Sequence, residues 1–334
     1  MKTNHIIQRN LTALALLSAF SLQPLALLGQ GSLMPPGAPA PTMKSADQIE
    51  PRTIVNAVNT PGDANNLFII TNSGSYYLTT NLVGVSGQNG IEILTNNVTL
   101  DLNGFALQGV SGSSSGIDIP NSQTNITVRN GTISSWGSSG VMSLSLSSLN
   151  QVFERLNVSA NGQYGLMLAG GGVQRDCNCG NNLWDGIHVG SGTVSGCMAD
   201  NNGIYGIYVG SGTVSGCFVQ NNAWCGIYVI GSGSAVIGNN CSGNNTSGNV
   251  GRAGIYIDAL KARVENNQVT GSGNAGILVV GASGNIIIKN SVSGTAGGAV
   301  NNYVTLGAQI VGPIITNTVS GIITNSNPWA NFSF

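Results

Sequence analysis

The sequence predicts an all-β chain folded as a single-stranded, right-handed parallel β-helix of about ten coils, with three short strands in each coil. Three observations predict this fold. A Gly-Ile-x-Val phrase recurs along the chain, two successive repeats are almost identical, and no stretch shows the 3.6-residue periodicity of a helix. Charged residues make up only 7% of the chain, while a hydrophobic fraction of 41% supplies enough apolar side chains for a core.

The repeat has a period near 22 residues, and its regularity identifies the type of coil. Residues 190–197 return unchanged as residues 210–217, 20 residues later. Leucine-rich repeats have a similar length, but they need a Leu scaffold and a helical half. Short β-branched runs separated by Gly and by Asn-Asn pairs favour strands and turns instead. Copies of the phrase begin at Gly90, Gly116, Gly165, Gly186, Gly206, Gly226, Gly254 and Gly276, with weaker ones at Gly140 and Gly298.

Strand geometry gives each position of the phrase a direction. Because side chains alternate along a strand, Ile and Val point inward and x points outward. Stacked coils lie about 4.8 Å apart, so each Ile packs on the Ile of the next coil. Burial of such a side chain stabilises the fold by about 1.5–3 kcal/mol. The Asn pairs at 181–182, 201–202 and 221–222 are predicted to form turn ladders, since Asn tolerates left-handed backbone and its amide bonds to neighbours.

The two ends of the chain differ from the repeats. Residues 1–31 have the features of a signal peptide: Lys2 and Arg9, then an interrupted apolar run over 11–28, then small residues at Gly29 and Gly31. A membrane anchor is the alternative, but the run barely reaches spanning length. Residues 32–65 are interpreted as a Pro-rich arm or linker, 66–326 as the β-helix and 327–334 as a C-terminal cap. Residues 66–82 are expected to cover the first coil, and we expect no membrane span after signal removal.

Over residues 67–325 the chain resembles the pectin-lyase-like right-handed β-helix proteins. Residues 97–104, 128–133 and 48–53 resemble phrases of exported bacterial β-helix proteins of unknown role. The resemblance implies the fold. It implies no activity, because this fold carries lyases, hydrolases and adhesive fibres alike.

Three of the six cysteines, Cys177, Cys197 and Cys217, are spaced 20 residues apart and are expected to stack in register. Buried free thiols that pack as small apolar groups are one interpretation. Disulfides between neighbouring coils are another, since an exported chain permits them. Half of a zinc site at Cys177 and Cys179 is a third, but His188 is the only histidine after residue 31. We predict no metal site.

The outward x position carries a series of aromatic side chains. Down the stack it holds Glu92, Asp118, Met167, His188, Tyr208, Tyr228, Tyr256 and Leu278, with Tyr164, Trp184, Tyr205 and Trp224 beside it. An exposed aromatic ridge can pack against sugar rings. Alternatively, the rings pack on one another to stabilise the stack, or the insertion at 241–252 covers them. The predicted polysaccharide-binding residues are Trp184, Tyr205, Tyr208, Trp224, Tyr228 and Tyr256.

Catalysis would need titratable groups, and the best candidates are Asp185, His188 and Asp200, near Trp184. A glycoside hydrolase needs paired carboxylates, and a lyase needs a base and carboxylates for calcium. The sequence has no Asp-Asp pair and none of the short motifs of the pectinase group. A net charge of −1 excludes the basic surface that nucleic acid requires.

The sequence therefore favours an exported non-catalytic β-helix, secreted or at the cell surface. We expect a monomeric scaffold without a cofactor that binds polysaccharide through its Tyr/Trp ridge. The alternative is a polysaccharide lyase or glycoside hydrolase of the same fold, with calcium only in the case of a lyase.

Overall fold

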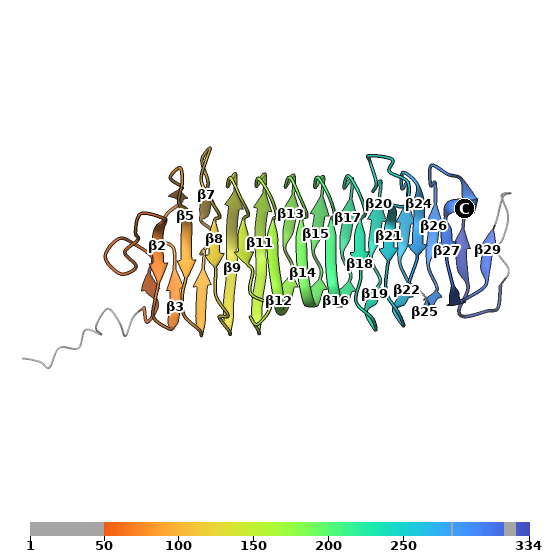
Figure 1. Cartoon of the computed structure of the whole chain (residues 1–334), viewed down its shortest axis with the longest axis horizontal. Helices are drawn as coiled ribbons and strands as arrows, with labels where there is room; N and C mark the ends of the chain where they lie inside the picture. Colours follow the sequence, from red (N-terminus) through yellow and green to blue (C-terminus); the bar gives the residue numbers. More distant parts are fainter. Residues whose placement is uncertain (1–49, 282, 317–324) are drawn as a thin grey trace, which may run out of the picture. The chain divides into compact units, whose positions relative to one another are not determined.

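The computed structural model describes residues 50–281, 283–316 and 325–334, and residues 51–334 form one compact unit. The predicted signal peptide and most of the predicted arm lie outside the described residues. The unit is a parallel β-helix of about 11 coils, which confirms the predicted fold class (Figure 1). Within these residues, all strand-to-strand pairings are parallel apart from an isolated bridge between Pro61 and Phe68. Among the described residues, no helix is long and apolar enough to span a membrane.

Three parallel sheets run along the stack, and each coil contributes one strand to each sheet. Sheet 1 contains β2 (Asn66–Ile70), β5 (Asn89–Ile93), β8 (Ile117–Ile119), β10 (Val141–Ser143), the first halves of β12 (Leu166–Arg175), β14 (Ile187–Ser195) and β16 (Ile207–Ser215), then β18 (Ile227–Val229), β21 (Ala253–Ile257), β24 (Ala275–Val279) and β27 (Tyr303–Thr305).

Sheet 2 contains β3 (Gly74–Tyr77), β6 (Val98–Asp101), the first halves of β9 (Ile126–Ser134) and β11 (Gln151–Ser159), the second halves of β12, β14 and β16, then β19 (Ala235–Ile237), β22 (Arg263–Glu265), β25 (Ser283–Ile288) and β28 (Ala308–Val311). Sheet 3 contains β4 (Leu82–Val83), β7 (Ala106–Gln108), the second halves of β9 and β11, then β13 (Asn178–Gly180), β15 (Met198–Asp200), β17 (Phe218–Gln220), β20 (Asn240–Ser242), β23 (Gln268–Thr270), β26 (Ser291–Ser293), β30 (Asn331–Ser333) and β29 (Ile314–Thr316). A 3₁₀ turn, η2 (Ala299–Asn301), precedes β27.

The repeated phrase builds sheet 1 and the core behind it, as predicted. Ile187, Ile207 and Ile227 are in register on neighbouring strands, and all three are fully buried. The glycine that opens the phrase is required by close packing. A Cβ atom on Gly206 would lie 2.5 Å from Val219 Cγ1 and 2.6 Å from Asn222 Nδ2. The turn between sheets 3 and 1 therefore admits no side chain at that position.

Buried asparagines join the coils at this turn and confirm the predicted turn ladders. The first Asn of each pair, such as Asn201 with a φ of 53°, adopts left-handed backbone. The second Asn points inward, and its Nδ2 donates to the Oδ1 of the next coil at 2.9–3.0 Å. We call this series the first Asn ladder. It consists of Asn161, Asn182, Asn202, Asn222 and Asn244.

A second Asn ladder, which the sequence analysis missed, lies at the turn between sheets 2 and 3. It consists of Asn239, Asn267, Asn290 and Asn331. The stacked cysteines occupy the same turn in earlier coils, and the backbone N–H of Cys217 donates to Asn239 Oδ1 at 2.9 Å. All six cysteines are buried and free, in agreement with the first of the three interpretations. Burial raises the pKa of the Cys179 and Cys241 thiols.

The two ends of the stack differ from what the sequence suggests. Residues 66–82 do not cover the first coil; they form it, since β2 pairs with β5 and β3 pairs with β6. β1 (Thr53–Ile54) then pairs with β3. At the other end, β30 lies between β26 and β29, parallel to both. Asn331 thereby enters the second Asn ladder, so the C-terminal strand is part of the last coils.

The first Asn ladder gives a prediction about stability. Asn202→Ala would remove the buried side-chain hydrogen bonds that Asn202 makes with Asn182, Asn222 and the Cys179 carbonyl, and the backbone N–H of Asn182 would lose its acceptor. Each such loss costs about 1–3 kcal/mol, so we expect the free energy of unfolding to fall by about 3 kcal/mol or more. Equilibrium urea unfolding measures this. The control is Asn201→Gly, since Gly adopts the same left-handed backbone without strain. Equal destabilisation by both substitutions would contradict a structural role for the ladder.

Candidate functional site

Eight rings cover neighbouring coils on the outer side of sheet 1. We call this set the aromatic column. The x position of the repeat directs one ring outward from each of β14, β16, β18 and β21, and the preceding turns supply the others. All are half-buried except Trp184, which is 36% exposed. The members of the column are Tyr164, Trp184, His188, Tyr205, Tyr208, Trp224, Tyr228 and Tyr256.

The rings of the column are in continuous contact. His188 stacks on Tyr208 with ring centroids 4.1 Å apart and an interplanar angle of 14°. Tyr228 lies 4.9 Å from both Tyr205 and Tyr256. Mutual packing, one of the two alternatives to a binding role, is therefore present. The outer faces of these half-buried rings still reach solvent, so packing and binding are compatible.

The insertion contributes a cation to the column. The guanidinium carbon of Arg252 lies 4.5 Å from the ring centroid of Trp224 and 5.8 Å from that of Tyr205. Arg252 Nη1 also donates to the Tyr205 hydroxyl at 3.3 Å. The end of the insertion at 241–252 thus covers part of the column. The sequence did not assign Arg252 to the site, because Arg252 and Tyr205 are 47 residues apart and no local sequence pattern indicates that they are in contact.

Asp185 and His188 form a hydrogen-bonded pair at the edge of the column. His188 Nδ1 lies 2.7 Å from Asp185 Oδ2, and the backbone N–H of Tyr205 donates to Asp185 Oδ1 at 3.1 Å. Asp185 is buried, whereas His188 is half-buried. Because the carboxylate occupies Nδ1, Nε2 is the ring nitrogen that remains for a ligand. A carboxylate that orients an imidazole in this way is a common arrangement for a general base.

The third predicted catalytic residue, Asp200, is placed elsewhere. It lies on β15 in sheet 3 and lines a hollow of about 210 Å³ with Asn178 and Met198. Its Oδ2 accepts a hydrogen bond from Asn201 Nδ2 at 3.0 Å. The structure therefore brings together two of the three candidates. It also brings together all six predicted polysaccharide-binding residues.

Two carboxylates lie farther along the outer side of sheet 1. Glu92 on β5 is in register with Asp118 on β8. Burial, followed by the charges of Asp118 and Asp63, raises the pKa of Glu92, and burial also raises the pKa of Asp118. Among the described residues, no group of three or more His, Cys, Asp or Glu side chains could hold a metal ion.

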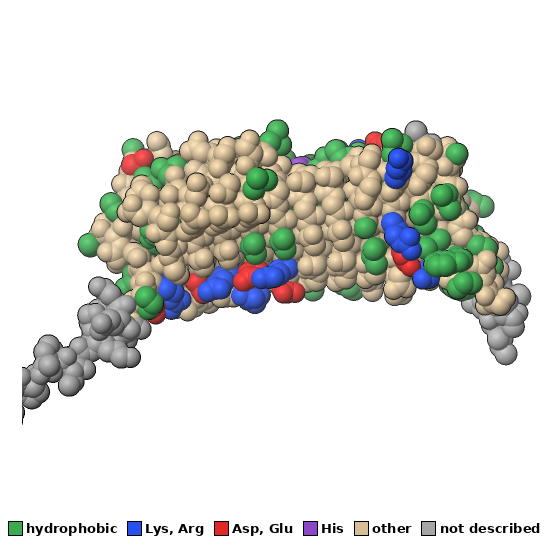
Figure 2. Space-filling view, turned by 90° about the horizontal axis from the view of Figure 1, so that it is seen from below, with side chains coloured by type: hydrophobic (Ala, Val, Ile, Leu, Met, Phe, Trp, Pro, Cys, Tyr) green, Lys and Arg blue, Asp and Glu red, His purple; other side chains and the backbone are tan. Residues whose placement is uncertain are grey.

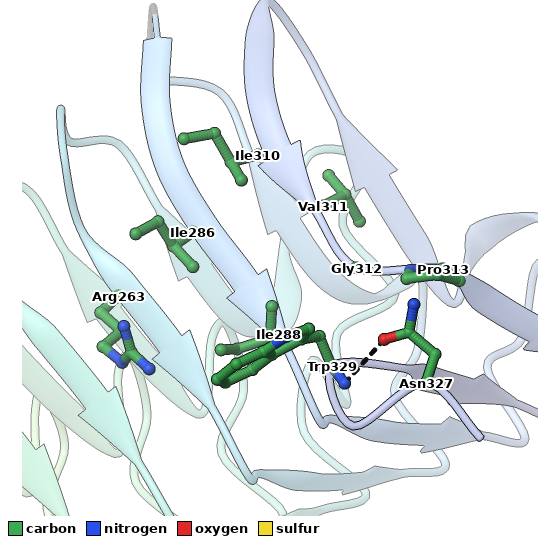
Figure 3. A pocket seen from close by; sticks show the side chains of 9 residues that line it. All are labelled: Arg263, Ile286, Ile288, Ile310, Val311, Gly312, Pro313, Asn327 and Trp329. Carbon is green, nitrogen blue, oxygen red and sulfur yellow. Dashed lines mark hydrogen bonds between the residues drawn. The ribbon is translucent and has the colours of Figure 1, made fainter. Parts of the chain in front are cut away.

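A separate hollow of about 370 Å³ lies near the C-terminal end (Figure 3). Its lining is mainly apolar, and the ring of Trp329 lies beside Ile288 in the view. The Trp329 backbone N–H donates to Asn327 Oδ1 at 2.9 Å. Arg263 is the charged residue of the lining. None of the residues predicted from the sequence to form a site lines it.

Comparison with known proteins assigns the family. The model of the right-handed β-helix region matches residues 66–215 and 210–334, and the chain belongs to this family. Comparison with curated proteins gave no match. The mannuronan C-5 epimerase AlgE4 A-module of Azotobacter vinelandii is similar in structure, with a TM-score of 0.53 and 14% identity over 84% of this chain and 88% of that module.

Two further solved structures are more distant. The Dettilon tailspike protein has a TM-score of 0.45 and 14% identity, over 75% of this chain and 60% of that one. The periplasmic alginate epimerase AlgG has a TM-score of 0.42 and 13% identity, over 73% and 76%. At 14% identity, the similarity to the AlgE4 module shows a shared fold.

The tyrosines of the column give a prediction about pH. Burial, followed by the charge of Asp258, raises the pKa of Tyr228 to about 12. Tyr228→Phe should therefore remove an ionisation near pH 12 from the phenolate absorbance titration of the folded protein. The pKa of Tyr228 is higher in the folded protein than the ordinary value of about 10 in the unfolded chain. The neutral phenol therefore stabilises the folded state fully below about pH 10, and this stabilisation is lost as the pH rises from 10 toward 12. Loss of a component near pH 10 instead, as in the urea-unfolded chain, would contradict the burial of this phenol.

Proposed function

We propose that the protein is an exported scaffold that binds a polysaccharide chain along the aromatic column. The observation that carries the proposal is the unbroken contact of half-buried rings across the strands β14, β16, β18 and β21. Flat aromatic faces pack against the C–H faces of sugars, and their polar edges keep hydrogen-bonding groups nearby. A column that follows the stack of coils suits a linear polymer better than a small compact ligand.

Polar groups beside the rings support the same proposal. The Arg252 guanidinium beside Tyr205 and the His188 imidazole beside the Tyr208 ring can donate hydrogen bonds to sugar hydroxyls. The similar AlgE4 module is described as a mannuronan epimerase, so a β-helix of this size can serve a polysaccharide-directed function. Export to the cell surface or beyond rests on the predicted signal peptide over residues 1–31. We propose that the protein acts as a monomer.

A substitution of two rings tests binding. Tyr208→Ala together with Tyr228→Ala should weaken binding to the best ligand of a polysaccharide panel by about fivefold or more, since each ring contact contributes about 0.5–1.5 kcal/mol. Tryptophan fluorescence titration measures the affinity, because Trp184 and Trp224 belong to the column. Trp329→Ala is the matched control, since this half-exposed ring lies outside the column. A flat response to every polysaccharide would remove the proposal.

A second candidate function is a polysaccharide lyase or glycoside hydrolase. The specific observation in its favour is the bond of 2.7 Å between Asp185 and His188, beside the Tyr208 ring. In a lyase, His188 Nε2 would take the proton from the carbon next to the uronate carboxyl group while Asp185 stabilises the charged imidazole. The C4–O glycosidic bond would break as the C4=C5 double bond forms, and the leaving oxygen would take a proton from solvent. Asp200 on sheet 3 takes no part in this version of the mechanism.

Product assays separate the two candidates. If the protein is a lyase, incubation with polyuronates releases unsaturated products, and His188→Gln lowers the rate by at least about 100-fold. Tyr256→Phe is the control, because it changes the column without touching the pair. The assay is run with and without calcium, and reducing ends are counted to detect hydrolysis. Release of neither product type would exclude the enzyme and leave the binding scaffold in place.

A further inference from the structure

A row of arginines follows a different edge of the stack, where sheet 2 turns into sheet 3. Figure 2 shows the blue and red side chains gathered in a line along this edge. Strand register explains the line, because Asp101, Arg129, Glu154 and Arg175 occupy the same position in four successive coils. Arg155 follows Glu154 directly. In a chain with only 7% charged residues, this alignment of charge is a distinct feature.

Buried carboxylates hold the arginines in place. Arg155 Nη2 lies 2.6 Å from Glu154 Oε1, and Arg175 Nε lies 2.7 Å from Glu154 Oε2. Arg129 Nε donates to Asp101 Oδ2 at 3.0 Å. Arg52 also contacts Asp101, so four guanidinium groups share two carboxylates. Burial alone would raise the pKa of Glu154, but its two arginine partners lower it.

The row presents its cations to solvent and its anions to the interior. The side chains of Asp101 and Glu154 are 8% and 4% exposed. Those of Arg129, Arg155 and Arg175 are 34%, 50% and 51% exposed. Asp176, which is exposed beside Arg175, is a neighbouring carboxylate that faces solvent. A ligand approaching the edge therefore meets guanidinium groups first.

The backbone at Arg155 indicates that this cation is retained against a local cost. Arg155 has a φ of 51°, in the left-handed region. The equivalent turn positions in other coils hold Asn130, Asp176, Gly196 and Gly216, residue types that accept this conformation, and Lys289, which pairs with Glu265 as Arg155 pairs with Glu154. For most other residues it costs roughly 1–2 kcal/mol. Glu154 is buried, and a buried carboxylate left short of a partner costs several kcal/mol, so its pairing with Arg155 offsets this cost and holds an exposed guanidinium at the turn.

We propose that Arg129, Arg155 and Arg175 form a second binding surface, for a linear polysaccharide that carries carboxylate groups. Guanidinium groups bind carboxylates with two parallel hydrogen bonds, and the buried acids fix their orientation in advance. The arginines recur at the spacing of the coils, so they suit an anion that recurs along a chain. This surface is separate from the aromatic column on sheet 1, and it does not depend on the function proposed for that column.

The test compares two double variants with the same change in net charge. Arg155→Gln with Arg175→Gln should weaken binding of polygalacturonate by at least about tenfold at low ionic strength and remove most of its salt dependence. Arg263→Gln with Lys289→Gln should leave binding unchanged, since these two cations pair with Glu265 on the same edge but four coils beyond Arg175. Isothermal titration calorimetry measures both, in a Tyr208→Ala, Tyr228→Ala background that removes the column.

A triple variant controls for loss of stability, and two further ligands test whether the row is specific for carboxylates. If the loss of both arginines destabilises the chain by leaving Glu154 unpaired, the triple variant that adds Glu154→Gln removes the buried charge and should show the same loss of binding. Equal weakening by the two double variants would overturn the proposal. So would binding of single-stranded DNA as tight as that of polygalacturonate, because the row would then be a general polyanion surface. Neutral dextran should show no dependence on the row.

Discussion

The fold depends on one interaction, the hydrogen bond from the Asn side chain of one coil to the Asn of the next. A β-helix must turn its chain three times in each coil, and each turn brings backbone groups into a dry interior. In the first Asn ladder, Asn202 Nδ2 donates to the Cys179 carbonyl and to Asn222 Oδ1, so one amide satisfies groups of neighbouring coils. The ladder also explains why the repeat opens with Gly, because the Asn222 amide lies where a Cβ of Gly206 would be.

Strict register has a direct consequence for the surface. Once the coils are aligned by the ladders, every outward position becomes a column of side chains at the coil spacing of about 4.8 Å. Identical residues then lie next to one another in register, as Tyr208 and Tyr228 do on sheet 1. Opposite charges can also alternate, as Arg129 and Glu154 do at the end of sheet 2. The fold therefore converts a one-dimensional repeat into long, linear surfaces that match the geometry of linear polymers.

The aromatic column and the row of arginines differ in how the protein stabilises side chains that are partly exposed to solvent. The aromatic rings cover one another and remain half-buried, which limits the apolar area left in water. The arginines keep their charge in water while buried acids restrict their motion. A single chain can thus present a face suited to sugar rings and an edge suited to sugar carboxylates, both supported by the same core of Ile and Val.

The sequence by itself determined the fold class, the inward Ile positions and the outward ring positions, because all of these follow from a period of about 20–28 residues and from strand alternation. Only the tertiary structure decided which distant residues meet. Asp200 is only 12 residues from His188 in the sequence. It nevertheless lies on β15 in sheet 3, whereas His188 lies on the part of β14 in sheet 1. Arg252 reaches Tyr205 from an insertion two coils onward, and β30 enters between β26 and β29. These placements depend on turn lengths and on long-range strand pairing, which no local pattern of residues encodes.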